Sequence, residues 1–316
     1  MTGRRRDPIL ALLMHRNAGS RSCLALVAGI WIAACGGGSG TNTPDGGTAP
    51  GTGGNGGTSG TGGSSTLSHC PTDKPGPALA RVRWSDGIAF CVDSTEVTNA
   101  DYAKFLAANL KADSQPSVCS WNLSFLPAPV DTKMTNGPAC PTFDPTNRSD
   151  RPVVCVDWCD ADAYCRWAGK RLCGHPSGAA INNPTDPHGN EWLIACSGDK
   201  SDSTYPYGKD PTVGRCVDRR YPQPMPDVRP GKEATMCEGG VAGVFDMSGN
   251  AWEWTNDCDT LGSTSTVSNA DTPCAPQGGS FSSDVLMASC LDTAPFHRKD
   301  VAGDTGFRCC ANAEFF

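Results

Sequence analysis

The spacing of apolar side chains predicts two amphipathic helices. The first begins at Thr98 and continues through Asn109. Thr98 is a favourable N-cap, and Asp101 stands where a capping box needs its acid. The apolar residues of this segment recur at the spacing of one helical face. They are Tyr102, Phe105 and Leu106.

The second predicted helix begins at Asp157, and Asp160 follows three residues later as the partner of a second capping box. The helix is expected to stop at Gly169, which two basic residues follow. Its apolar face carries Trp158, Ala161, Tyr164 and Ala168. Elsewhere the apolar runs are short and lie between clusters of Gly, Pro, Asn and Asp, so we expect few long strands. The pattern predicts much irregular chain around a small helical and β core.

The first 68 residues differ from the rest. Residues 1–35 combine a basic start with a short apolar run, Leu24 to Ala34, which is typical of a cleaved export signal and too short to span a bilayer. Cys35 follows small residues as in a bacterial lipobox, which predicts a lipid-bearing first residue; an ordinary secretory signal is the alternative. Residues 36–68 are rich in Gly, Thr and Ser and predict a flexible tether with a reach of roughly 30 Å. The folded domain is then expected to span residues 69–316.

Charge limits the kinds of partner. The chain carries a formal net charge of −7, and the predicted signal contains five arginines and one acid, so the remainder is near −11. Such a charge argues against nucleic acid as the main partner. We expect a monomer that contacts the membrane through its lipid anchor. Gly36, rather than Asp, follows Cys35, and by resemblance to Gram-negative lipoproteins this favours the outer membrane of the cell envelope.

The cysteine content predicts disulfides. Of 18 cysteines, Cys23 and Cys35 fall in the first 35 residues, and 16 remain between Cys70 and Cys310. In an exported protein an even number is typical of a disulfide framework. Zinc-site patterns are missing, because no C-x2-C occurs and the five histidines are scattered.

The stretch GVFDMSGNAWEWTND, residues 243–257, surrounds a Ser-Gly-Asn turn with large apolar side chains. Asn250 and Glu253 stand three residues apart and present hard oxygens, as Ca²⁺ prefers. The alternative is that Asn250 fixes the turn and Glu253 pairs with a buried donor.

Five stretches together resemble the formylglycine-generating enzyme and sulfatase-modifying factor family, in family order. They are FCVDSTEVTNADYAKFL (90–106), RPVVCVDWCDADAYCRWAGKRLC (151–173), GVFDMSGNAWEWTND, QGGSF (277–281) and GFRCC (306–310). The resemblance implies an α+β fold, related to C-type lectins and poor in regular secondary structure. It also implies calcium near the GN-x-WEW turn, with Asn250 and Glu253 as ligands.

The resemblance fails at the copper site. The family's oxidases follow the Gly-Gly-Ser-aromatic stretch with a C-x4-C pair that holds Cu(I), and soft thiolates are what that ion requires. Here no C-x4-C exists; Ser283 takes the first position, and the region of the second reads Leu286-Met287-Ala288. We therefore expect no copper, and we expect Cys290 to be half of a structural disulfide.

Two further histidines lie in an insertion between Arg171 and Glu191. His175 and His188 could form a metal site with Glu191, but two exposed loop histidines are the favoured interpretation, since a metal site needs converging ligands and supporting contacts. Signatures of serine hydrolases and of phosphate-binding loops are absent from the sequence.

We therefore predict a binding or structural module that does not oxidise cysteine. Its ligand would be a peptide or a glycan, held where the enzymes hold substrate. The expected binding surface comprises Trp254, Ser280, Phe281 and Arg308. The alternative is a copper-dependent formylglycine-generating oxidase acting on sulfatase cysteine, which requires two unpaired cysteines to meet.

Overall fold

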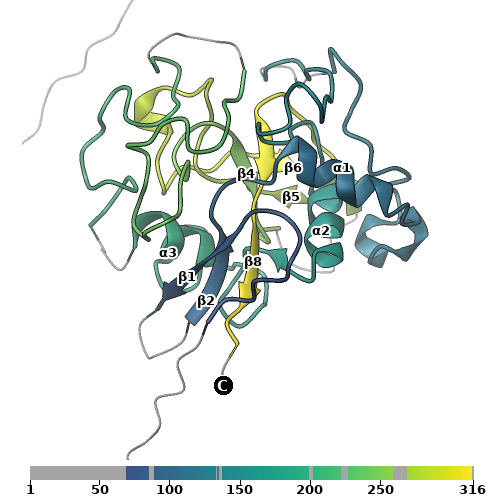
Figure 1. The fold of residues 1–316 in the computed structure, drawn as a ribbon, viewed down its shortest axis with the longest axis horizontal. Coiled ribbons are helices and arrows are strands. Elements are labelled where there is room, and N and C mark those ends of the chain that lie inside the picture. The colour runs from purple at the N-terminus through teal and green to yellow at the C-terminus, as the bar shows by residue number, and fades with distance from the viewer. Residues whose placement is uncertain are drawn as a thin grey trace, which may run out of the picture. The chain divides into compact units, whose positions relative to one another are not determined.

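The computed structural model describes residues 69–84, 89–132, 134, 137–198, 202–221, 227–258 and 269–314. These residues belong to one compact unit, Gly63–Phe316. Regular elements are short, and irregular chain connects them (Figure 1). The predicted signal, Cys35 and the predicted tether lie outside the described residues.

The largest sheet has four antiparallel strands in the order β1-β2-β8-β3. They are β1 (Leu79–Arg83), β2 (Ala89–Asp93), β8 (Cys309–Asn312) and β3 (Arg171–Leu172). Two smaller pairs complete the β structure: β4 (Trp252–Trp254) runs parallel to β7 (Thr305–Phe307), and β5 (Pro273–Cys274) runs antiparallel to β6 (Phe296–His297). Strand β8 thus brings the end of the domain between segments from its first half.

Both predicted helices are present. Helix α1 (Asn99–Ala107) is capped by Thr98, whose side chain accepts from the backbone N–H of Asp101, and it ends two residues before the predicted Asn109. Helix α2 (Trp158–Trp167) has the predicted capping box, in which Asp157 and Asp160 each accept from the other's backbone N–H. Gly169 follows with a positive φ, as a helix stop requires.

Helix α3 (Glu191–Ser197) was not predicted from the sequence; Asn190 caps it by accepting from the backbone N–H of Leu193. Short 3₁₀ turns cover 112–114, 117–119, 269–271 and 285–287. None of the helices among the described residues could span a lipid bilayer.

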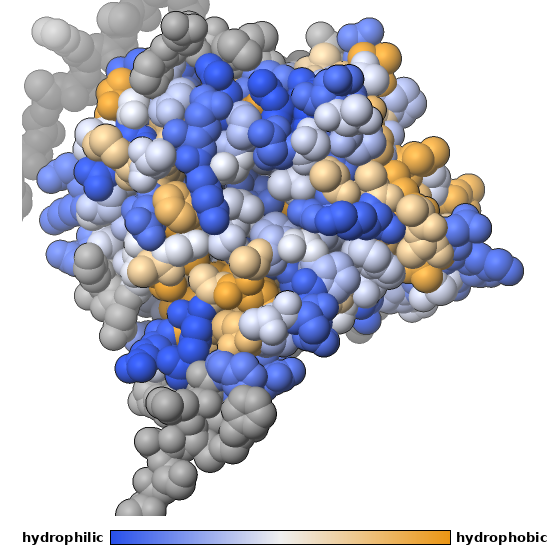
Figure 2. Space-filling view, in the orientation of Figure 1, coloured by the Kyte–Doolittle hydropathy of each residue, from blue (hydrophilic) through white to orange (hydrophobic). Residues whose placement is uncertain are grey.

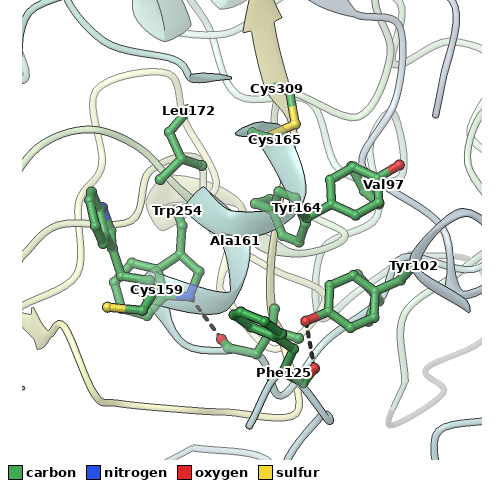
Figure 3. Close-up of a cluster of buried hydrophobic side chains, with 14 of the residues drawn as sticks. Val97, Tyr102, Phe125, Cys159, Ala161, Tyr164, Cys165, Leu172, Trp254 and Cys309 are labelled. Atoms are coloured by element: carbon green, nitrogen blue, oxygen red, sulfur yellow. Dashed lines mark hydrogen bonds between the residues drawn. A yellow bond between two sulfur atoms is a disulfide. The ribbon is translucent and has the colours of Figure 1, made fainter. Parts of the chain in front are cut away.

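Helices cover the main sheet on both faces. Cys309 belongs to the core cluster that α1 and α2 form, whereas the next residue, Cys310, belongs to the cluster that α3 forms. Successive side chains of a strand point to opposite faces, so β8 separates the two clusters. Figure 3 shows the first cluster, where the Tyr102 hydroxyl donates to the carbonyl of Phe125 at 2.7 Å.

Disulfides fasten the irregular segments to these elements. All 16 cysteines from Cys70 to Cys310 are paired, in eight bridges. Cys309 and Cys310 hold α2 and the chain after β3 onto β8, through Cys165 and Cys173 respectively. The bridges Cys70–Cys91, Cys119–Cys159, Cys140–Cys155, Cys196–Cys290, Cys216–Cys237 and Cys258–Cys274 fasten the loops.

Hydrophilic residues cover most of the face seen in Figure 2, and apolar residues gather in a few separate places. The large apolar side chains that are exposed come from loops and turns rather than from the sheet or α2. They include Leu123, Leu126, Val130, Leu286 and Met287.

Candidate functional site

The GVFDMSGNAWEWTND stretch forms a tight turn that leads into β4. Asp246 and Asn250 have positive φ angles of 60° and 59°, which side chains of this kind tolerate better than most. Gly249 lies so close to the carbonyl of Val217 that a Cβ would stand 2.3 Å from its oxygen, so only glycine fits there. The turn aims the acidic and amide side chains of this stretch into the interior.

Glu253 meets Arg308 in that interior. Arg308 Nε donates to Glu253 Oε2 and Arg308 Nη2 to Oε1, each at 2.7 Å, and the indole of Trp192 donates to Oε2 at 2.7 Å. Both charged residues are fully buried. Removing one partner of such a two-bonded pair destabilises the protein, because the other charge is then buried without a counter-charge. Glu253 therefore has the buried donor that our alternative interpretation expected.

Two more carboxyl groups approach the same guanidinium. Glu96 is 4.0 Å from Arg308 Nη2 and accepts from the side-chain amide of Asn250 at 2.8 Å. Burial, and then the nearby Asp246, raise the pKa of Glu96 well above its usual value, and burial raises the pKa of Asp246 to about 6. Burial beside only one guanidinium therefore favours the protonated forms of Glu96 and Asp246.

These contacts do not fit a Ca²⁺ ion between Asn250 and Glu253. The Oδ1 atom of Asn250 accepts from the backbone N–H of Arg229 at 2.8 Å, and the oxygens of Glu253 are occupied by Arg308 and Trp192. A calcium ion needs six to eight oxygens that are free to face it. Among the described residues, no group of three or more His, Cys, Asp or Glu side chains is placed to hold a metal.

The four residues expected to form an open binding surface are instead in the interior. Trp254, Ser280 and Arg308 have no exposed area, and 7% of Phe281 is exposed. The indole of Trp254 donates to the carbonyl of Val156, which fixes it in the core beside α2. The expectation requires this correction because Trp254, Ser280 and Arg308 each bond to a partner in the interior instead of facing solvent.

A polar cluster that the sequence analysis did not single out lies beside these buried residues. The hydroxyls of Ser280 and Ser282 each donate to Asp304 Oδ2 at 2.7 Å, and the backbone N–H of Ser280 donates to the hydroxyl of Ser283 at 3.0 Å. Burial raises the pKa of Asp304, and the two hydroxyls oppose that shift. The signal in the sequence is positional: Asp304 directly precedes β7, which pairs with the strand of the WEW motif.

This cluster opens into a cavity of about 400 Å³. Its wall is largely apolar, and Ser282 and Asp304 supply the polar groups. A second cavity, of about 340 Å³, shares two wall residues, Pro295 and Phe296, with the first. The adjoining cavities make this region the candidate ligand site of the domain.

The positions that correspond to the copper ligands contain no thiol. Ser283 is the first, and Leu286, Met287 and Ala288 occupy the region of the second. Cys290 is bonded to Cys196 of helix α3. Hydroxyl and hydrocarbon groups do not bind Cu(I) as two thiolates do, so these residues do not fit a copper site.

His175, His188 and Glu191 do not form the metal site that the sequence left open as an alternative. Both Glu191 oxygens bind Arg171, and Oε2 also accepts from the backbone N–H of Gly174 at 3.0 Å. His175 bonds locally to Ser177, and His188 is exposed. Glu191 therefore holds α3 to β3 instead of completing a metal site with the two histidines.

Fold and site together define a disulfide-linked α+β domain with a buried centre formed by Arg308 and Glu253. The two cavities that share Pro295 and Phe296 form a two-part cavity in the same domain. The chain matches the sulfatase-modifying factor enzyme 1-like domain over residues 56–313. It belongs to this family and has the fold of formylglycine-generating enzymes.

The chain is similar both to formylglycine-generating enzymes and to a relative that is named inactive. It is 28% identical over 265 residues to the formylglycine-generating enzyme of Bos taurus, covering 71% of this chain and 66% of that one. It is 26% identical over 265 residues to the inactive C-alpha-formylglycine-generating enzyme 2 of Mus musculus, covering 71% and 75%. The solved structure of PvdO from Pseudomonas aeruginosa aligns with a TM-score of 0.48 and 17% identity, over 75% of this chain and 92% of that one.

Proposed function

We propose that this protein is a binding module of the bacterial cell envelope that does not oxidise cysteine. The observation that carries the proposal is the replacement of the copper pair: Ser283 occupies the first position, and every cysteine from Cys70 to Cys310 is in a disulfide. Copper-dependent oxidation needs two thiolates on one metal ion, and this arrangement leaves none. The inactive mouse relative is a member of the family without the activity, which makes such a role compatible with the fold.

The rest of the proposal concerns location. Eight disulfides are consistent with folding outside the cytoplasm, where thiols oxidise. We propose that Cys35 carries a lipid in the outer membrane and that residues 36–68 extend the domain from the membrane surface. The two-part cavity would then face a peptide or glycan of the envelope.

The direct test uses protein purified without reductant. Cu(I) is titrated against a chromophoric chelator, and a cysteine-containing sulfatase peptide is incubated with the protein, copper and oxygen. We expect the protein to withdraw no stoichiometric Cu(I) and the peptide to keep its cysteine, whereas the bovine formylglycine-generating enzyme, run in parallel, forms the aldehyde. One bound Cu(I) per chain together with an aldehyde product would replace the binding-module proposal with the oxidase alternative.

A further inference from the structure

The larger cavity has an acceptor-only polar end. It is bounded by Met134, Trp252, Pro295 and Phe296, with Ser282 and Asp304 at the polar end. The hydroxyl hydrogens of Ser280 and Ser282 both point to Asp304 Oδ2. A ligand can therefore use only the lone pairs of the Asp304 carboxylate and of the exposed Ser282 hydroxyl, all of which accept hydrogen bonds. A ligand group that binds here must bring donors.

Among the described residues, no Lys, Arg or His lies within ion-pair distance of the carboxylate of Asp304. Only 3% of the residue is exposed, and Oδ2 accepts from the hydroxyls of Ser280 and Ser282. A buried carboxylate without a counter-ion is costly, and burial accordingly raises its pKa. A positive group from a ligand would remove that cost.

The remaining wall suits a cation on an aliphatic chain. Trp252 and Phe296 supply aromatic rings, whose faces attract organic cations, and Pro295 and Met134 supply apolar contact for methylene groups. A planar guanidinium binds best when it spans both oxygens of a carboxylate. Here Oδ2 already accepts two hydroxyls, which favours the compact ammonium group over the guanidinium fork.

We propose that this cavity binds an alkylammonium group, with Asp304 as its counter-ion and Ser282 as a second acceptor. The inference rests on the proposed binding function and names the chemistry of its ligand. Two sources carry this group, a free alkylamine and the side chain of a lysine. The second cavity, which Pro295 and Phe296 also line, gives room for a second residue of a peptide, so a lysine peptide should bind more tightly than the amine.

Four probes test the proposal by isothermal titration: n-butylammonium, and acetylated, amidated tripeptides Gly-X-Leu in which X is lysine, arginine or norleucine. We expect the lysine peptide to bind tightest, butylammonium to bind measurably, and norleucine, which has the same chain without the charge, not to bind. Binding of the lysine peptide alone would assign the source to peptides. Equal affinity for the lysine and norleucine peptides, or absence of binding by every probe, would overturn the proposal.

Variants locate the site. Asp304→Asn should weaken lysine-peptide binding by roughly tenfold or more, because it removes the charge of a charge-assisted bond. Ser282→Ala, at an exposed position that does not threaten folding, should weaken it severalfold. Asp210→Asn is the matched control, since Asp210 is exposed, does not line the cavity and changes net charge equally. Unchanged affinity in the Ser282 and Asp304 variants would refute the assignment, whereas the copper test above decides the proposed function independently.

Discussion

The pairing of Glu253 with Arg308 explains why the most unusual stretch of the sequence is buried. Arg308 donates to both carboxylate oxygens of Glu253, and the indole of Trp192 donates to one of them. Asn250 fixes the turn by accepting from Arg229 and donating to Glu96. The motif therefore stabilises the centre of the domain.

Glu253→Gln should destabilise the protein by about 3 kcal/mol or more, because Arg308 would remain buried with an incomplete counter-charge. Urea unfolding at pH 7.5 measures the change in the free energy of unfolding. Glu314→Gln is the control, since Glu314 is exposed and its ion pair with His69 is at the surface; we expect less than about 0.5 kcal/mol there. A loss at Glu253 as small as that of the control would show that the pair contributes little.

Some of this site could be predicted from sequence and some could not. Hard oxygens on a turn indicate either a metal or a buried donor, and the choice depends on Arg308, which lies 55 residues away from Glu253. No local pattern specifies that partner. For the same reason we expected four buried residues at a surface, namely Trp254, Ser280, Phe281 and Arg308. A sequence motif does not specify which of its side chains are buried and which are exposed.

At the scale of elements, the cap of α2 is an unusual source of pH dependence. Asp157 and Asp160 each accept from the other's backbone N–H, and Asn122 donates to Asp160 at 2.8 Å. Burial raises the pKa of Asp157 to about 6, and burial together with the charge of Asp157 raises the pKa of Asp160. No basic group of the described chain forms an ion pair with either carboxyl.

The sign of the effect follows from proton binding. The folded protein binds these protons more tightly than the unfolded chain, so the stabilisation is present below the unfolded pKa near 4 and is lost as pH rises through about 6. We expect the free energy of unfolding to be higher at pH 5 than at pH 7.5, with a contribution from this pair on the order of 1 to 2 kcal/mol.

Urea unfolding at both pH values tests this prediction. Asp160→Asn removes one of the two charges, and its difference between pH 5 and pH 7.5 should be clearly smaller than that of the wild type. Asp101→Asn, at the corresponding position of α1, should leave the difference unchanged. The interpretation is wrong if stability falls from pH 7.5 to pH 5 or if the Asp160 variant keeps the full difference.

Helices α1 and α2 were predictable because their caps and apolar faces are local features of the sequence. Helix α3 was missed, because Asn190 follows an insertion rich in Pro and Gly, and seven residues are too few for a clear period. The strands were not located, since β3, β5 and β6 have two residues each and depend on partners from distant segments.

At the scale of the whole molecule, two disulfides close nearly the same loop. Cys165–Cys309 spans 144 residues and Cys173–Cys310 spans 137, and they meet at adjacent positions of β8. While one bridge is intact, the other closes only a short additional ring. Loss of both releases the long connection, although other bridges still shorten it.

A double-mutant cycle tests this arrangement. Replacing both cysteines of either bridge by alanine should cost about 3 kcal/mol, and removing both bridges should cost at least about 1 kcal/mol more than the sum, because loop entropy grows with loop length. The Cys140–Cys155 bridge, which spans 15 residues elsewhere in the domain, combined with Cys165–Cys309 is the control and should be additive. An additive result for the adjacent pair would show that the two bridges act independently.

The number of cysteines predicted a disulfide framework, whereas the connectivity came only from the structure, since sequence does not specify pairing. The proposed function depends on the absence of any free thiol that could bind copper between Cys70 and Cys310. The most direct measurement is mass spectrometry after maleimide labelling of the denatured protein, before and after reduction. We expect no label on the 16 cysteines from Cys70 to Cys310 before reduction and 16 labels afterwards. Labels on two of these cysteines before reduction, above all on Cys196 and Cys290, would contradict it.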